Sequence, residues 1–117
     1  MSTIDLFPIV KLLLPDVLVE YFELSTHKLE SGILHFYFEE YNTLPKEYKK
    51  GDAISKGFYP EITIQDFPLR GKQVYLHIKR RRWQDKQSKQ VVMRDWDLVV
   101  KGTRMTKEFA SFLKQIH

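Results

Sequence analysis

The sequence predicts an α+β domain with a short N-terminal helix, a β-hairpin, a three-stranded antiparallel meander and a C-terminal helix. Two stretches, 33–40 and 73–83, alternate apolar and polar residues with the period of two that a half-buried strand requires. A glycine-containing turn precedes each of them. The final stretch, 107–116, instead places its apolar residues at i, i+3, i+4 and i+7, which is the spacing of one helix face.

The length of 117 residues and the content of 43% hydrophobic and 14% aromatic residues favour one compact domain with a real core. Within it we distinguish three segments. Residues 1–48 form an acidic helix-plus-hairpin segment, residues 49–60 a loop, and residues 61–117 a basic β-meander with the C-terminal helix.

The N-terminal helix is expected from Pro8, a favourable first-turn residue, to Leu14, where Pro15 stops it. The next residues, 17–23, fit either a strand or a helical face.

A hairpin follows, with strands over 24–29 and 33–40 joined by the turn 30–32. On the second strand, alternation places Leu34, Phe36 and Phe38 on one face and His35, Tyr37 and Glu39 on the other. Residues 42–60 are rich in glycine, proline and lysine, and are expected to be the one long loop.

The meander is expected to comprise strands 61–67, 73–83 and 90–100. The turn 68–71 and the polar loop 84–89 would join them. The helix over 107–116 would begin after Thr106, a suitable N-cap.

Composition excludes several classes of protein. Cysteine is absent, which rules out disulfides, thiol nucleophiles and cysteine-bound zinc, and fits the reducing cytoplasm. No apolar run approaches the roughly 18 residues that a membrane helix needs, and no signal peptide is evident. We therefore expect no membrane association.

Catalytic sets are not evident either. The sequence contains no phosphate-binding or nucleophile-elbow motif, and the spacing of its histidines does not indicate a metal site. The carboxylates Asp66, Asp85, Asp95 and Asp97 allow a metal-dependent nuclease. We favour structural roles for them: Asp66 capping a turn, Asp85 in a loop, and the other two opposite basic residues across a hairpin. We expect no enzyme activity and no cofactor.

Charge is distributed unevenly along the chain, although its net value is only +4. Residues 1–48 hold three cations and eight carboxylates, and residues 49–117 hold sixteen cations and seven carboxylates. Such asymmetry favours a polyanionic partner, with a solvated basic surface as the main alternative.

The segment 70–94 interleaves arginines and lysines, which bind phosphates, with aromatic rings, which can stack on bases. Strand 73–83 would project beyond the core as a ribbon, because alternation sends Lys79 and Arg81 to one face and Arg80 and Arg82 to the other. For Trp83 and Trp96 we favour packing inside the protein. The candidate DNA-binding residues are Arg70, Lys72, Lys79, Arg80, Arg81, Arg82, Lys86, Lys89 and Arg94.

A family resemblance is carried by residues 57–83. The elements Asp66-Phe67-Pro68, Gly71-Lys72, Val74-x-Leu76-x-Ile78 and Arg81-Arg82-Trp83 match, in order and spacing, the N-terminal domain of ISL-type insertion-sequence transposases. The whole chain is similar to the stand-alone N-terminal region protein of split, ISAon-type elements. The zinc-binding cysteines of the larger family are absent here.

This resemblance implies a DNA-binding accessory region of a split transposase, without the catalytic core, in the bacterial cytoplasm and associated with the nucleoid. Its implied partners are duplex DNA at the element ends and a separate catalytic transposase chain, and it could form a homo-oligomer. The alternatives are a protein-interaction module that docks the catalytic chain, or a remnant without activity. Docking would use either the acidic half or the helix face formed by Phe109, Phe112, Leu113 and Ile116.

Overall fold

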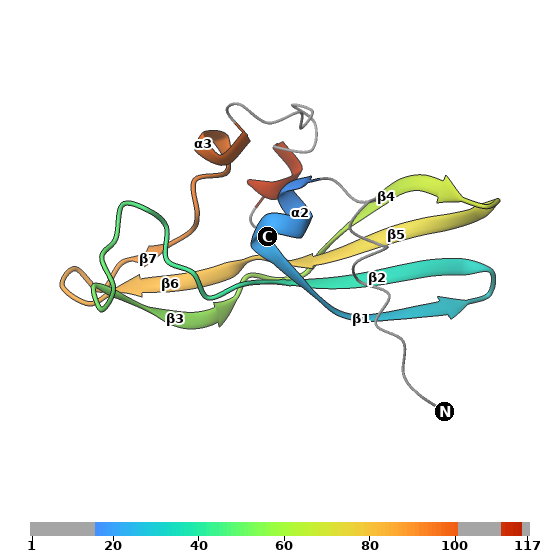
Figure 1. Cartoon of the computed structure of the whole chain (residues 1–117). Helices are drawn as coiled ribbons and strands as arrows, with labels where there is room; N and C mark the ends of the chain where they lie inside the picture. The colour runs from blue at the N-terminus through green and yellow to red at the C-terminus, as the bar shows by residue number, and fades with distance from the viewer. Residues whose placement is uncertain (1–15, 101–110, 116–117) are drawn as a thin grey trace, which may run out of the picture.

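The structure is a computed structural model that describes residues 16–100 and 111–115, and it has the α+β architecture expected from the sequence (Figure 1). The predicted helix 8–14 lies outside the described residues, as does most of the predicted helix 107–116, of which residues 111–113 are helical. In chain order the elements are α2 (Asp16–Tyr21), β1 (Phe22–Glu30), β2 (Ile33–Glu40), β3 (Ala53–Phe58), β4 (Ile62–Leu69), β5 (Lys72–Lys79), β6 (Arg81–Asp85), β7 (Val91–Val92) and α3 (Trp96–Val100).

The larger sheet has four strands in the order β1-β2-β5-β4. The hairpins β1–β2 and β4–β5 are antiparallel and were both expected from the sequence. They join through a parallel pairing of β2 with β5, which runs from Ile33 opposite Gln73 to Glu39 opposite Lys79. The predicted acidic segment and the basic meander therefore share one sheet.

The second sheet has the order β3-β6-β7 and corrects two expectations. The expected strand 73–83 is divided at Arg80, so that β5 belongs to one sheet and β6 to the other. The expected loop 42–60 contains β3, which pairs with β6 from Ala53 opposite Asp85 to Phe58 opposite Arg81. Its alanine, serine and glycine give β3 a weak strand propensity, and pairing with β6 overrides that propensity.

The expected third strand, 90–100, is also wrong. Only Val91 and Val92 pair with β6, and the chain then turns into α3. The carboxylate of Asp95 explains this helix start, because its Oδ1 accepts the backbone N–H of Leu98 at 3.1 Å. This is the contact that a helix N-cap makes, and alternation does not reveal it.

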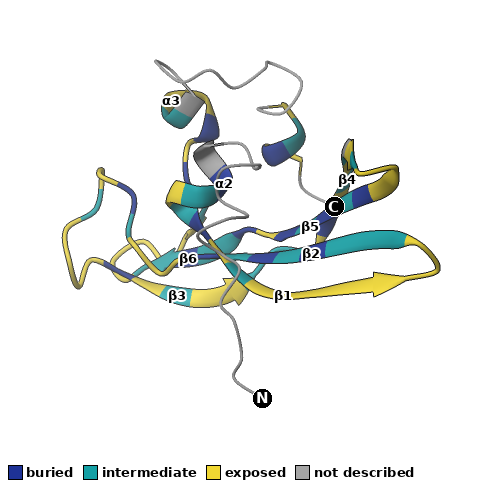
Figure 2. Ribbon diagram, turned by 45° about the vertical axis from the view of Figure 1, so that its right-hand side comes forward, coloured by how far each residue is buried: buried dark blue, intermediate teal, exposed yellow. Residues whose placement is uncertain are grey.

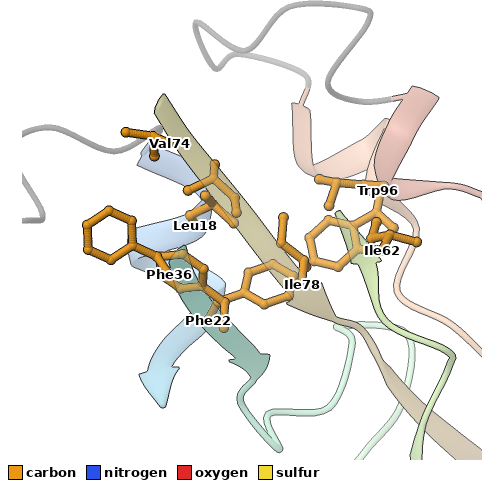
Figure 3. Close-up of a cluster of buried hydrophobic side chains, with 10 residues drawn as sticks. Leu18, Phe22, Phe36, Ile62, Val74, Ile78 and Trp96 are labelled. Carbon is orange, nitrogen blue, oxygen red and sulfur yellow. The ribbon is translucent and has the colours of Figure 1, made fainter. Parts of the chain in front are cut away.

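The helices cover one face of the larger sheet, while β1 is exposed along most of its length (Figure 2). Beneath the helices lies a core to which α2, the sheet and α3 all contribute (Figure 3). Trp96 stacks on Phe22 with ring centroids 5.5 Å apart. The fully or almost fully buried apolar residues of this core are Leu18, Phe22, Phe36, Phe38, Ile62, Val74, Leu76, Ile78, Trp96 and Leu113.

No helix within residues 16–100 and 111–115 is both long enough and apolar enough to cross a membrane.

Candidate nucleic-acid interface

Arg94 is an internal residue. Its Nε lies 2.7 Å from Oε2 of Glu40, and both side chains are buried. Its Nη2 donates to the carbonyl oxygen of Thr43, and its guanidinium lies over the rings of Tyr21 and Trp83. Burial raises the pKa of Glu40, although Arg94 and Arg81 oppose the shift. Arg94 is thus committed to an ion pair inside the protein and exposes only 7% of its surface, which argues against the expected role in DNA contact.

Arg80 is also buried, with 0% of its surface exposed. Its Nη1 donates to the carbonyl oxygens of Leu113, at 2.8 Å, and Gln115, so that it caps the end of the last helical turn. Its guanidinium lies 5.8 Å from the ring centre of Tyr59, and burial lowers its pKa. The expected exposure of Arg80 on a ribbon face is therefore wrong as well.

Arg80 belongs to the basic run Lys79-Arg80-Arg81-Arg82, whose other residues differ in how much surface they expose. Arg81 donates from its backbone N–H to Oε1 of Glu40 at 2.8 Å and from Nη1 to Oγ of Ser55 at 2.6 Å. Arg82 is partly buried and donates from Nη2 to the carbonyl oxygen of Lys56. Of these residues, only Lys79 is exposed. Arg80 thus holds the last helical turn, and Arg81 links β6 to Glu40 in β2 and to Ser55 in β3.

A different group of cations gathers where β3 and β6 meet their flanking turns. The strands are paired, and the N–H of Lys86 donates to the carbonyl oxygen of Asp52 at 2.9 Å, which joins the turn before β3 to the loop after β6 (Figure 1). We call this surface the basic end. Its members are Lys49, Lys50, Lys56, Arg82, Lys86 and Lys89, of which all but Arg82 are exposed.

Two carboxylates lie within the basic end, and both accept hydrogen bonds from backbone N–H groups. Oδ2 of Asp52 accepts the N–H of Lys49 at 3.2 Å. Oδ1 of Asp85 accepts the N–H groups of Gln87 and Ser88 at 2.8 and 2.9 Å, and these bonds lower the pKa of Asp85. Both carboxylates therefore help to shape the turns that display the lysines.

The sequence did not identify half of this surface. Lys49, Lys50 and Lys56 belong to the stretch assigned to a loop. The β3–β6 pairing brings Lys56 beside Arg82, and it joins the turn that carries Lys49 and Lys50 to the loop that carries Lys86 and Lys89. By contrast, two expected DNA-binding residues, Arg70 in the β4–β5 turn and Lys72 at the start of β5, lie at the opposite end of the molecule from the β6–β7 loop (Figure 1). The predicted DNA-binding residues are therefore separated in the structure. Some lie in the basic end, Arg70 and Lys72 lie at the β4–β5 end, and Arg80 and Arg94 make internal contacts.

The face of the larger sheet that the helices leave uncovered carries four rings that stand against one another. We call them the ring ladder: Tyr37, His77, His35 and Tyr75. Tyr37 and His77 stack across β2 and β5 with centroids 4.4 Å apart, and Nδ1 of His35 lies 2.8 Å from Nε2 of His77. Because the ring faces cover each other, they offer little surface to a base.

The ring ladder is also poor in positive charge. Oε2 of Glu61 lies 3.4 Å from Nδ1 of His77, and Lys28 beside Tyr37 is paired with Glu30 at 3.0 Å. The other two aromatic candidates, Trp83 and Trp96, are buried, as favoured from the sequence. Stacking on bases therefore finds less support than phosphate contact.

The carboxylates considered for nuclease chemistry lie apart and have structural partners. Asp85, expected in a loop, is instead the last residue of β6 and accepts backbone N–H groups of the loop that follows, while Asp95 caps α3 and Asp97 pairs with Lys114 at 2.9 Å. The expected pairing of the last two across a hairpin is therefore wrong. Asp66 lies in β4 and is also engaged. The described part of the chain contains no group of three or more histidines and carboxylates able to hold a metal ion.

The expected docking face is only partly described. Leu113 is fully buried in the core of the single chain and Phe112 packs against that core, while Phe109 and Ile116 lie outside the described residues. Leu113 is therefore unavailable to a partner.

No protein-family model, curated protein or solved structure matches the chain.

Proposed function

We propose that this protein is a non-catalytic, DNA-binding accessory region of a split insertion-sequence transposase. The class of element comes from the resemblance of residues 57–83. The observation that supports DNA contact is the basic end, which has six cations and two carboxylates, and both carboxylates accept backbone N–H groups. In this proposal the separate transposase polypeptide cuts and joins the DNA.

The physical argument rests on phosphate geometry and exposure. Lysines on short turns reach phosphate oxygens as point charges without entering a groove, and such contacts position a protein without reading sequence. Arg82 adds a planar donor group beside them, and its Nη2 is held by the carbonyl oxygen of Lys56. Preference for one DNA sequence would require a side chain that reaches base edges, for which Arg82 is the nearest candidate.

Two matched triple variants test this proposal. Lys49, Lys86 and Lys89 changed to glutamine remove three exposed cations from the basic end. Arg70, Lys72 and Lys79 changed to glutamine remove three exposed cations elsewhere. In fluorescence anisotropy with a 20-base-pair duplex at 50 mM salt, we expect the first variant to bind about 10- to 100-fold more weakly, and the second to bind within about threefold of wild type.

The proposal fails if wild type does not bind at 50 mM salt, or if both variants lose the same affinity. Equal losses would mean that binding follows net charge alone. A duplex carrying the element ends, compared with a scrambled duplex of the same length, then reports on the transposase assignment separately.

A further inference from the structure

A cleft of about 380 Å³ lies between the loop after β2 and the helices α2 and α3. Its apolar walls come from Leu44 and Pro45 in that loop and from Leu98 and Val99 in α3. Leu98 keeps 51% of its surface exposed, which is high for a leucine that lines a cleft. The described residues thus leave an apolar side chain at an open hollow.

One member of the internal ion pair reaches the cleft. Arg94 lines it, and this guanidinium is held by Glu40, by the Thr43 carbonyl and by the ring of Tyr21. The charge of Arg94 is therefore balanced from inside the protein. These contacts hold Arg94 in one position at the cleft, and binding sites are usually pre-formed in this way.

The rim of the cleft is acidic. Glu20, Glu47 and Asp95 line it and are exposed, and Lys46 is the one exposed cation among the lining residues. This sign is opposite to the net charge of +4 and to the basic end. Such a rim repels phosphate and attracts cations, so that the cleft is unsuited to DNA.

We propose that this cleft binds a basic segment of another protein, which inserts one aliphatic side chain against Leu98 while its lysines or arginines face Glu20, Glu47 and Asp95. The anchor supplies buried apolar area, and the charges steer the approach and select the partner. The proposal is independent of DNA binding, because it uses a different surface and the opposite charge.

The test uses the full-length ¹⁵N-labelled protein and a synthetic capped peptide, Lys-Lys-Leu-Lys-Lys. A second peptide replaces leucine with serine, and a third replaces the lysines with glutamates. In heteronuclear NMR titrations, we expect the first peptide to shift the backbone signals of Leu44, Leu98 and Val99. We expect the other two to shift them at least about fivefold less at equal concentration.

Charge variants sharpen the test, because they change affinity in opposite directions. Glu47→Gln should weaken binding about two- to fivefold, whereas Lys46→Gln should strengthen it by a similar factor. Both residues are exposed in the same loop, so folding should be unaffected. Leu98→Ser should weaken binding about tenfold.

Several outcomes would overturn the proposal: no shift at the cleft, equal shifts with the serine peptide, or the same direction of change for Glu47→Gln and Lys46→Gln. Contacts between the methyl groups of Leu98 and residues 1–15 in the free protein, seen as nuclear Overhauser effects, would also overturn it. In that case the chain itself would occupy the cleft.

Discussion

Glu40, the last residue of β2, links the two sheets and holds Arg94. Its Oε1 accepts the backbone N–H of Arg81 at the start of β6, and its Oε2 accepts Nε of Arg94. The removal of one partner from a buried pair leaves an uncompensated charge, which costs more than the pair itself contributes. The basic residues of this protein therefore serve internal structure as well as any external partner.

We expect Arg94→Met to lower the free energy of unfolding by about 3–5 kcal/mol, because the buried carboxylate of Glu40 loses its cation. The double variant with Glu40→Gln should recover part of this loss. The glutamine carries no charge, and its oxygen still accepts the N–H of Arg81. Urea unfolding, followed through the fluorescence of Trp83 and Trp96, gives both values, and equal stability of the single and double variants would contradict the argument.

His77 makes stability depend on pH. Burial lowers its pKa, and the charge of His35 adds to the shift while Glu61 opposes it. Below pH about 6.5 the unfolded chain therefore binds a proton that the folded chain does not, so that folding stability falls as pH drops. Above that pH this effect is absent.

We expect the urea midpoint to fall between pH 7.5 and pH 5.5, and to fall less in His77→Gln. His27→Gln is the matched control, since His27 is exposed on β1. Other titrating groups contribute to the slope in all three proteins, so the comparison between variants carries the test. An identical slope in wild type and His77→Gln would rule out this role for His77.

At the scale of elements, local pattern predicted the hairpins and the burial of alternate residues, because these depend on period two and on nearby turns. Pattern did not predict the parallel pairing of β2 with β5 or the pairing of β3 with β6, because strand partners distant in sequence leave no local signal. It also favours a strand over Trp96–Val100, because alternation does not reveal the N-cap at Asp95. The basic end could not be predicted for the same reason, because its two groups of lysines come together only when β3 pairs with β6.

β3 depends on an irregularity at Gly57. The register between β3 and β6 shifts between Ser55 and Phe58, and Gly57 has a φ of 85°, which side chains other than glycine rarely adopt. We expect Gly57→Ala to destabilise the protein by about 1–2 kcal/mol through backbone strain, since no heavy atom lies within 4 Å of the added methyl group. Lys56→Ala, an exposed neighbour, should change stability by less than about 0.5 kcal/mol. Equal effects of the two changes in thermal unfolding would argue against a special conformation at Gly57.

At the scale of the whole molecule, the chain extends over 49 × 37 × 26 Å because β5 continues into β6 and each strand belongs to a different sheet. The exposed cations are consequently far apart. The basic end lies at the β3–β6 sheet, and Arg70 and Lys72 lie at the turn of the other sheet. A rigid duplex can therefore contact the basic end without contacting Arg70 and Lys72.

This separation predicts a salt dependence that distinguishes the two groups. If about four phosphates are neutralised by the basic end, log K should fall against log salt with a slope of about −3.6, a loss of about 100-fold between 50 and 200 mM. Changing Lys49, Lys86 and Lys89 to glutamine should flatten the slope by about 2.7, since three counterion-releasing contacts are removed. The triple change of Arg70, Lys72 and Lys79 should leave the slope within about 0.5 of wild type, because those cations would not contact phosphate. Anisotropy titrations at 50, 100 and 200 mM salt are sufficient. Equal flattening by both triple variants would show that DNA contact is spread over the surface rather than held at one end.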